Sequence, residues 1–481
     1  MAVAAAAVDE WQLVDVDPAT LVLQDNVRLD PRLDNELIAS VRERGVLQPI
    51  VAYRCVSGLA VLHGQRRALA AVRAGRASVR VVVVPAPGLV DRVVDQVVEN
   101  DHREGITATE RARAYQQLAL LGLSAAQIAR RTAARGPEVV AAGLAVAGSD
   151  RAWAAAVEHQ LTLEQAAAVA EFAGDDQAVQ RLVAAAERGG FMHQVQRLRD
   201  ARVAAAERAA AAAPLVEAGL RVVDEPGYQD PARRLDLLRH DGVGLTVEAH
   251  ASCPGHAAFL DVRYDDDPDG EGEDGGEPQE PASVWVPVYV CLDPAAHGHT
   301  SKYGVLWPSP AEKSEEQRER ERERAERRDV IDSNRAWDSA RKVRVAWLRT
   351  FLARRGGVKG TTAFAASMLA GCDLPLRQAM ECRHQLAHEL LGADISERGF
   401  GDRRGAAIDA LLSGASEGRA QVVLLGLVLC ALEAGTTRDS WRRPATYTTR
   451  YLRFIESQGY ELSQVELRAC GVQPEGAKGS G

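Results

Sequence analysis

The sequence has few aromatic residues and no long apolar run. Phenylalanine, tyrosine and tryptophan together make up 5% of its 481 residues, although 46% of the chain is hydrophobic. Its cores must therefore be filled largely by alanine and aliphatic side chains, which favours helices. The most apolar segment, residues 422–432, is shorter than the roughly 20 residues that span a bilayer. It predicts a buried helix, and we expect no membrane partner.

Signals for export are also missing. The N-terminus, MAVAAAAVDEW, has neither the basic start nor the apolar centre of a signal peptide. The seven cysteines are odd in number and fit no secreted disulfide framework, so we expect a cytoplasmic protein with reduced thiols. Acidic residues outnumber basic ones, 67 to 58, and the net charge is -9. Binding to nucleic acid would therefore need a local basic face.

The length and the succession of patterns predict an α+β protein with several domains. Residues 1–104 mix strand and helix patterns, 105–215 are helical with a candidate helix-turn-helix, and 216–310 are rich in strand patterns. A charged linker helix is expected over 311–333, followed by a helical C-terminal domain over 334–481.

Several element boundaries can be predicted inside these domains. A helix over 34–45 should stop at its final glycine, and a strand pair should follow over 46–64. Pro214 should end the last helix of the second domain. The segment 243–251 has a strand pattern, whereas the acidic, glycine-rich segment 265–281 predicts a disordered loop.

A glycine stands directly before a predicted helix that opens with two arginines. Gly64 allows a close approach of backbone N–H groups, and Arg66 and Arg67 add positive charge beside them. Such a turn can hold phosphate. On this short stretch alone, the commoner alternative is a turn glycine followed by two solvated arginines.

Four segments in order carry a family resemblance. They are GVLQPI at 45–50, GQRRALAA at 64–71, ENDHR at 99–103, and a helix pair over 123–148. Over about 15–210 the chain resembles the ParB family of chromosome and plasmid partition proteins. The resemblance implies a CTP-dependent DNA clamp that uses Mg²⁺, binds double-stranded DNA, forms a homodimer and works with a ParA-type ATPase. It also implies a ParB/sulfiredoxin-like fold for the N-terminal domain.

The resemblance assigns roles to the residues that match its motifs. Those that would bind nucleotide are Gly45, Gln48, Pro49, Ile50, Gly64, Gln65, Arg66, Arg67, Glu99, Asn100 and Arg103. The first four would line the pocket, and the glycine box would hold the triphosphate. Glu99 and Asn100 would lie near the metal and phosphates, and Arg103 would couple the nucleotide state to DNA.

Two departures from the family pattern keep other functions open. Gln65 replaces the usual glutamate and cannot act as a base, so CTP hydrolysis should be weak or absent. A plasmid-borne transcriptional regulator without a nucleotide switch therefore stays an alternative, as does a ParB-like nuclease. The sulfiredoxin relatives of this fold need a cysteine in the glycine box, where this chain has His63 and Gly64. His63 could donate to a phosphate or simply pack at the strand end.

The helix pair suggests how DNA would be held. Its candidate DNA-binding residues are Arg130, Arg131, Arg135 and Glu138. The second helix is otherwise alanine, valine and glycine, so it offers few groups that read base edges. The arginines would contact DNA phosphates, while another segment of the chain would provide the sequence specificity. The alternative is an ordinary pair of packed helices.

Two Cys/His clusters in the β-rich region predict a structural Zn²⁺ site. The candidate ligands are Cys253, His256, Cys291, His297 and His299, with either of the last two as the fourth ligand. Two such paired clusters supply what tetrahedral zinc requires. The alternative is two unrelated cysteines near exposed histidines. His384 and His388, one helical turn apart, are expected to be surface residues.

Overall fold

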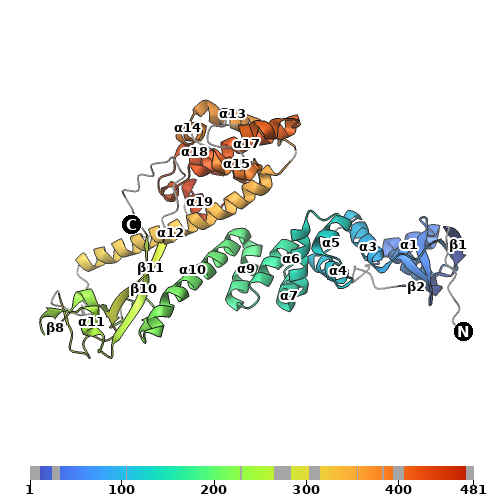
Figure 1. The fold of residues 1–481 in the computed structure, drawn as a ribbon. Helices are drawn as coiled ribbons and strands as arrows, with labels where there is room; N and C mark the ends of the chain where they lie inside the picture. Colours follow the sequence, from blue (N-terminus) through green and yellow to red (C-terminus); the bar gives the residue numbers. More distant parts are fainter. Residues whose placement is uncertain are drawn as a thin grey trace. The chain divides into compact units, whose positions relative to one another are not determined.

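The computed structural model divides the chain into two compact units, Met1–Phe191 and Met192–Gly481 (Figure 1). It describes residues 11–23, 33–103, 106–227, 230–264, 283–302, 315–354, 356–381, 384–393 and 406–472. Among these residues no helix has both the length and the apolar character needed to cross a membrane. The predicted loop 265–281 lies outside the described residues.

The first unit opens with a mixed five-stranded sheet in the order β1-β5-β3-β4-β2. Its elements are β1 (Gln12–Val16), η1 (Pro18–Thr20), β2 (Leu21–Val22), α1 (Asn35–Arg44), β3 (Ile50–Cys55), β4 (Gly58–His63), α2 (Gln65–Arg73), β5 (Val79–Val84) and α3 (Leu89–Arg103). Strand β3 pairs antiparallel with β4 and parallel with β5. The predicted hairpin is confirmed, and so is the end of α1 at Gly45, whose φ is 75°.

The two faces of this sheet have different cores. On one face, apolar side chains of α1 and α2 pack against Ile50, Val81 and their neighbours. Tyr53, Ala60 and Val84 form a smaller cluster that the first core does not include. The sheet thus fixes the loop before β3 and the turn after β4, where the predicted glycine box begins.

In the described part of the first unit, six helices follow α3. They are α4 (Ala108–Leu120), α5 (Ala125–Arg131), α6 (Pro137–Ala147), α7 (Asp150–Glu158), α8 (Leu163–Glu171) and α9 (Asp176–Arg188). Capping boxes begin α4 at Thr107, α5 at Ser124 and α8 at Thr162, so three of these starts are encoded locally. Val93 and Val97 of α3 belong to the same core as α4, α5 and α6.

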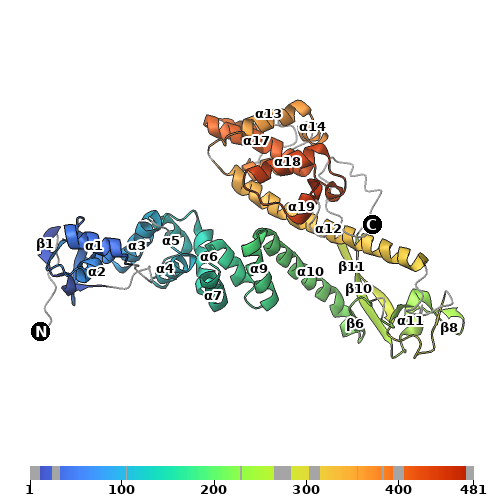
Figure 2. The same ribbon diagram turned by 180° about the vertical axis from the view of Figure 1, so that it is seen from behind.

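The second unit contains a small β-rich region. Its elements are α10 (Phe191–Glu217), β6 (Arg221–Val223), β7 (Arg233–Arg234), η2 (Leu235–Leu237), β8 (Leu238–His240), β9 (Val243–Gly244), α11 (Val247–His250), β10 (His256–Tyr264), β11 (Ser283–Cys291) and β12 (Thr300–Ser301). One sheet has the order β6-β10-β11-β7, with β6 beside β10 as Figure 2 shows, and the other has the order β12-β8-β9.

The C-terminal region of the second unit is helical. Its elements are α12 (Glu315–Leu352), α13 (Thr361–Gly371), α14 (Leu374–Glu381), α15 (Gln385–Leu391), α16 (Ala406–Leu412), α17 (Glu417–Ala434), η3 (Arg438–Trp441), α18 (Thr446–Ser457) and α19 (Gln464–Ala469). The apolar run at 422–432 forms much of the buried α17, as predicted.

A buried ionic network ties these C-terminal helices together. Arg344 of α12 is fully buried and donates to Glu433 of α17 at 2.8 and 3.1 Å and to Glu466 of α19 at 2.7 Å. Tyr451 and Tyr460 donate to the same two carboxylates at 2.7 and 3.1 Å. Burial opposes ionisation of Glu466, but the positive charge and hydrogen bonds of Arg344, together with His193 and a hydrogen bond from Ser463, outweigh it and hold the pKa of that carboxyl below its usual value.

Several sequence predictions differ from the structure. Pro214 lies inside α10, near its end, rather than terminating it. The segment 243–251 is not one strand: Thr246 caps the short helix α11, because its hydroxyl accepts a hydrogen bond from the Ala249 amide. The expected boundary at 333 falls inside the continuous helix α12.

The expectation that His384 and His388 are surface residues is wrong. His388 is 9% exposed and its Nδ1 lies 2.6 Å from the carbonyl oxygen of His384. His384 is partly buried, with Nε2 2.8 Å from the carbonyl oxygen of Leu427. Both imidazoles thus help to satisfy backbone groups of the C-terminal core.

Candidate functional site

The glycine turn before α2 has the geometry of an anion cradle. Gly64 has φ 95°, which favours glycine, and it provides no side-chain cap to the first amides of α2. A Cβ at this position would stand 3.1–3.2 Å from the Arg67 guanidinium. The turn therefore places backbone N–H groups and an arginine side by side, which suits phosphate.

Arg67 connects this turn to the loop before β3. Its Nη1 donates to the carbonyl oxygens of Gln48 and Pro49 at 2.7 and 3.0 Å. Arg66 instead forms an ion pair with Asp34, the N-cap of α1, at 3.0 Å. The structure thus brings the first two predicted motifs together through Arg67. Asp34 is a contact that the sequence reasoning missed.

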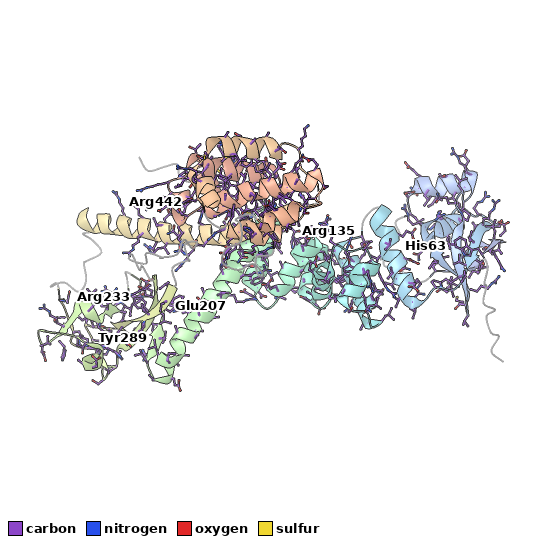
Figure 3. All side chains as sticks on the ribbon, turned by 45° about the horizontal axis from the view of Figure 1, so that its top comes forward. His63, Arg135, Glu207, Arg233, Tyr289 and Arg442 are labelled. Atoms are coloured by element: carbon purple, nitrogen blue, oxygen red, sulfur yellow. The ribbon has the colours of Figure 1, made fainter. Side chains whose placement is uncertain are left out.

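The third motif, ENDHR, contacts the C-terminal end of β4 through its first residue, Glu99. Nδ1 of His63, the last residue of β4, lies 2.6 Å from Oε2 of Glu99 on α3 (Figure 3 labels His63). A second link joins α3 to the sheet, because Arg92 donates to the Tyr53 hydroxyl at 3.0 Å. The side chain of Glu99 is 26% exposed, so the pair remains accessible to solvent.

Other predicted nucleotide-binding residues have different surroundings. The side chain of Ile50 is fully buried in the sheet core and can reach a ligand only through its backbone. Gly45 ends α1, and a Cβ there would stand 3.3 Å from Nη2 of Arg76. Asn100 and Arg103 lie on α3, and their side chains are outside the described part of the chain.

The predicted helix pair is α5 and α6, packed on α4. A Cβ at Gly143 of α6 would stand 2.6 Å from Cδ2 of Tyr115 on α4, so this glycine permits the close approach of the two helices. Arg130 and Arg131 end α5 and are exposed. Arg131 has a long 3.5 Å contact with Asp91.

The start of α6 combines both signs of charge. Arg135 is exposed in the turn before α6 (Figure 3). The Glu138 carboxylate folds back over Gly136 and fills the space where a Cβ would stand. It therefore complements the helix start with its negative charge, an N-terminal arrangement that stabilises helices. The arginines, rather than Glu138, form the exposed groups suited to phosphate.

A Cys/His cluster lies where the two sheets of the second unit meet. It consists of His250 at the end of α11, Cys253 in the following turn, Cys291 at the end of β11 and His299 just before β12. Their ligand atoms all lie within 4.8 Å of one another. His250, Cys291 and His299 are buried. Four such donors fit a metal ion.

The composition of this cluster corrects the predicted ligand set. Cys253, Cys291 and His299 were predicted, but His250 takes the place expected for His256. His297 is not a member of the cluster. It packs against Gly255, because a Cβ at Gly255 would stand 2.7 Å from Cδ2 of His297. The missed signal is the spacing of two residues between His250 and Cys253, which the strand assignment for 243–251 obscured.

The distances and charge states suit zinc. Sγ of Cys253 lies 3.6 Å from Nε2 of His299, and sulfur and nitrogen ligands of one tetrahedral zinc ion stand about 3.6 Å apart. Burial, helped by neighbouring imidazoles, lowers the pKa of His250 to about 4, which keeps it neutral. Burial also raises the pKa of Cys291 to about 12, so its thiolate needs a cation beside it.

Sequence comparisons identify the N-terminal domain. Residues 4–100 match the ParB N-terminal domain family. The chain belongs to the ParB family. The chromosome-partitioning protein Spo0J of Thermus thermophilus is 32% identical over 182 residues, which cover 37% of this chain and 66% of that protein. A probable chromosome-partitioning protein ParB of Treponema pallidum is 32% identical over 176 residues, covering 33% and 54%.

These matches leave most of this ParB-family chain unaccounted for. They span just under two thirds and about half of the two relatives' lengths. A crystal structure of C-terminally truncated Caulobacter crescentus ParB, complexed to the centromeric parS site, is 20% identical, with a TM-score of 0.28. It covers 35% of this chain and 91% of that one.

Proposed function

We propose that this ParB-family protein binds DNA in chromosome or plasmid partition and uses CTP with Mg²⁺ to close a DNA clamp. The observation that supports it most is the Arg67 bridge, which joins the glycine turn to Gln48 and Pro49. The β3–β4 hairpin separates these two motifs in the sequence, and Arg67 brings them together beside a second arginine, Arg66. The partition role is the one that the names of the two relatives carry.

The residues of the turn would divide the work of holding a triphosphate. The Gly64 turn would offer backbone N–H groups, while Arg66 and Arg67 would supply positive charge. Glu99 would lie near Mg²⁺, which prefers carboxylate oxygens. Bound Mg²⁺ would neutralise phosphate charge, and Gln65 would leave hydrolysis slow or absent.

Helix α3 supports a link between this pocket and the DNA-binding helices. Glu99 and Arg92 contact the sheet domain, whereas Val93 and Val97 pack in the core of α4, α5 and α6. A change in the contacts of Glu99 on nucleotide binding would therefore act on α3, which packs against both the sheet and the helices α4, α5 and α6. Asn100 and Arg103, further along α3, would add to this coupling.

DNA contact would come mainly from phosphate-binding arginines. Arg130, Arg131 and Arg135 are exposed around the α5–α6 turn, and α6 carries few groups that read bases. We therefore expect part of the sequence specificity to come from another segment. A homodimer and a ParA-type ATPase partner follow from the family resemblance and belong to the same proposal.

The Cys/His cluster would hold a structural zinc ion. All four positions around the metal would be filled by protein side chains, as in structural rather than catalytic sites. The ligands come from α11, the following turn, β11 and the approach to β12. Zinc would thereby join two small sheets whose buried apolar clusters are small.

Binding of radiolabelled CTP to the full chain tests the proposal. With Mg²⁺ and DNA fragments of the host replicon present, we expect saturable binding that excess unlabelled CTP removes. Arg67→Ala should abolish it, whereas Arg80→Ala, which removes an exposed arginine of β5 outside the predicted motifs, should retain it. Absence of CTP binding under every DNA condition would eliminate the clamp.

A transcriptional regulator of the same fold without nucleotide switching is the second candidate. It is favoured by Gln65 and by the His63–Glu99 contact, which already engages the carboxylate expected near Mg²⁺. Selective DNA binding that is unchanged by CTP would support it. A ParB-like nuclease ranks third, and metal-dependent cleavage that Arg66→Ala removes would be its signature.

A further inference from the structure

The two ring nitrogens of His250 have different environments. Its Nδ1 lies 2.8 Å from Nδ1 of His256, which is hydrogen-bonding distance. Its Nε2 is buried and has no hydrogen-bond partner among the described residues. A buried nitrogen without a partner is costly unless something absent from the protein itself satisfies it. In this cluster that atom is the natural metal ligand.

The contact between the two imidazoles can hold only one proton. If His250 donates from Nδ1, its Nε2 carries a lone pair and can bind a metal. If His256 donates instead, the proton of neutral His250 sits on Nε2 and metal binding there is blocked. The metal-binding form therefore requires Nδ1 of His256 to be the acceptor.

We propose that His256 is a positioning residue of the zinc site, which accepts the Nδ1 proton of His250 and thereby presents His250 Nε2 to the metal. This inference rests on the proposed zinc site. It gives the predicted ligand His256 a different role, one step away from the ion. Such partners of metal-binding histidines fix both the tautomer and the ring orientation.

The fold holds the His256 ring in place. The ring stacks on Tyr289 of β11, with centroids 5.8 Å apart and planes inclined by 14° (Figure 3 labels Tyr289). The amide of His256 donates to the Cys253 carbonyl at 2.9 Å, closing a tight turn around Pro254 and Gly255. A Cβ at Gly255 would stand 2.8 Å from Sγ of Cys291, so the turn packs directly on a ligand.

Metal titrations of the full chain separate a positioning role from a ligand role. Zinc affinity is measured by competition with a chromophoric chelator, and Co²⁺ absorption reports the number of thiolates and the tetrahedral geometry. The variants are His256→Ala, His256→Asn, which keeps an acceptor oxygen, and His250→Ala. His240→Ala is the matched control, because His240 is an exposed histidine beside His299 and outside the cluster. Cys253→Ser/Cys291→Ser gives the background from other cysteines.

We expect His256→Ala to weaken zinc binding by about 10–100-fold while the Co²⁺ spectrum keeps its tetrahedral two-sulfur form. His256→Asn should restore most of the affinity, and His240→Ala should match the wild type. His250→Ala should change the Co²⁺ spectrum, because a nitrogen ligand is lost.

Two results would overturn the inference while leaving the zinc site intact. One is wild-type affinity in His256→Ala, and the other is loss of the tetrahedral spectrum in His256→Ala but not in His250→Ala, which would make His256 the ligand. A wild-type chain that binds neither ion above the double-serine background would instead refute the zinc site itself. If the alanine variant fails to fold, the asparagine variant carries the test. Co²⁺ absorption in His256→Asn would then show that the site is folded, and its zinc affinity would be compared with that of the wild type.

Discussion

Removal of zinc should loosen the β-rich region and leave the C-terminal helices unchanged. Among the described residues, the buried apolar cluster on β10 and β11 consists of Ala257, Phe259, Val288 and Val290. The three larger side chains contribute about 1.5–3 kcal/mol each. Zinc at about 1,000 times its dissociation constant would add about 4 kcal/mol, so the metal contributes as much as one or two of these residues.

Hydrogen exchange measures this effect locally in the full chain. The amides of β10 and β11 should exchange up to about 1,000-fold faster after chelation, because 4 kcal/mol corresponds to that factor. Amides of α17 should be unaffected, and Cys253→Ser/Cys291→Ser should exchange like the chelated protein. Equal exchange of β10 and β11 with and without zinc, or an equal response in α17, would refute the reasoning.

Four further predictions concern the rest of the chain. Arg344→Met leaves two buried carboxylates without their cation and should destabilise the C-terminal helices by about 3–5 kcal/mol, measured by hydrogen exchange in α17. The pKa of Glu466 in the folded chain is lowered from an ordinary value near 4.5. Its contribution to the free energy of unfolding should therefore be complete above that pH and lost as the pH falls below it. Hydrogen exchange of the same amides, measured as a function of acid pH, would follow this loss. Gly143→Val should cost about 1–3 kcal/mol through overlap with Tyr115, whereas an unchanged exchange rate in α4 would contradict the close packing. Arg130→Ala should weaken binding to all DNA sequences alike and reduce the slope of log affinity against log salt concentration by about one. An unchanged slope would show that this arginine does not contact phosphate.

Local sequence signals were sufficient for much of the N-terminal domain. Glycines at 45 and 64 and the β-branched strand residues mark the ends of α1, β4 and α2, and the structure follows them. The contact between His63 and Glu99 could not be predicted in this way. The two residues are separated by 36 positions and meet only because α3 returns to the sheet.

The Cys/His cluster shows where pattern reasoning fails. Three of the four cluster members were found by residue type and spacing, because cysteines and histidines near strand ends are informative. The sequence does not indicate His250 as a ligand, because the alternating apolar residues of this segment predict a strand, whereas Thr246 caps a helical turn there. The burial of His388 was equally hidden, since its exposure depends on packing among distant helices.

Calorimetric titration of CTP into the Mg²⁺-containing full chain, with and without DNA, tests the central claim most directly. The account predicts a saturable heat for CTP that is lost in Arg67→Ala while the sheet domain remains folded, because Arg67 joins the glycine turn to Gln48 and Pro49. No heat of binding in the wild type under either condition, or the same affinity in Arg67→Ala, would contradict it.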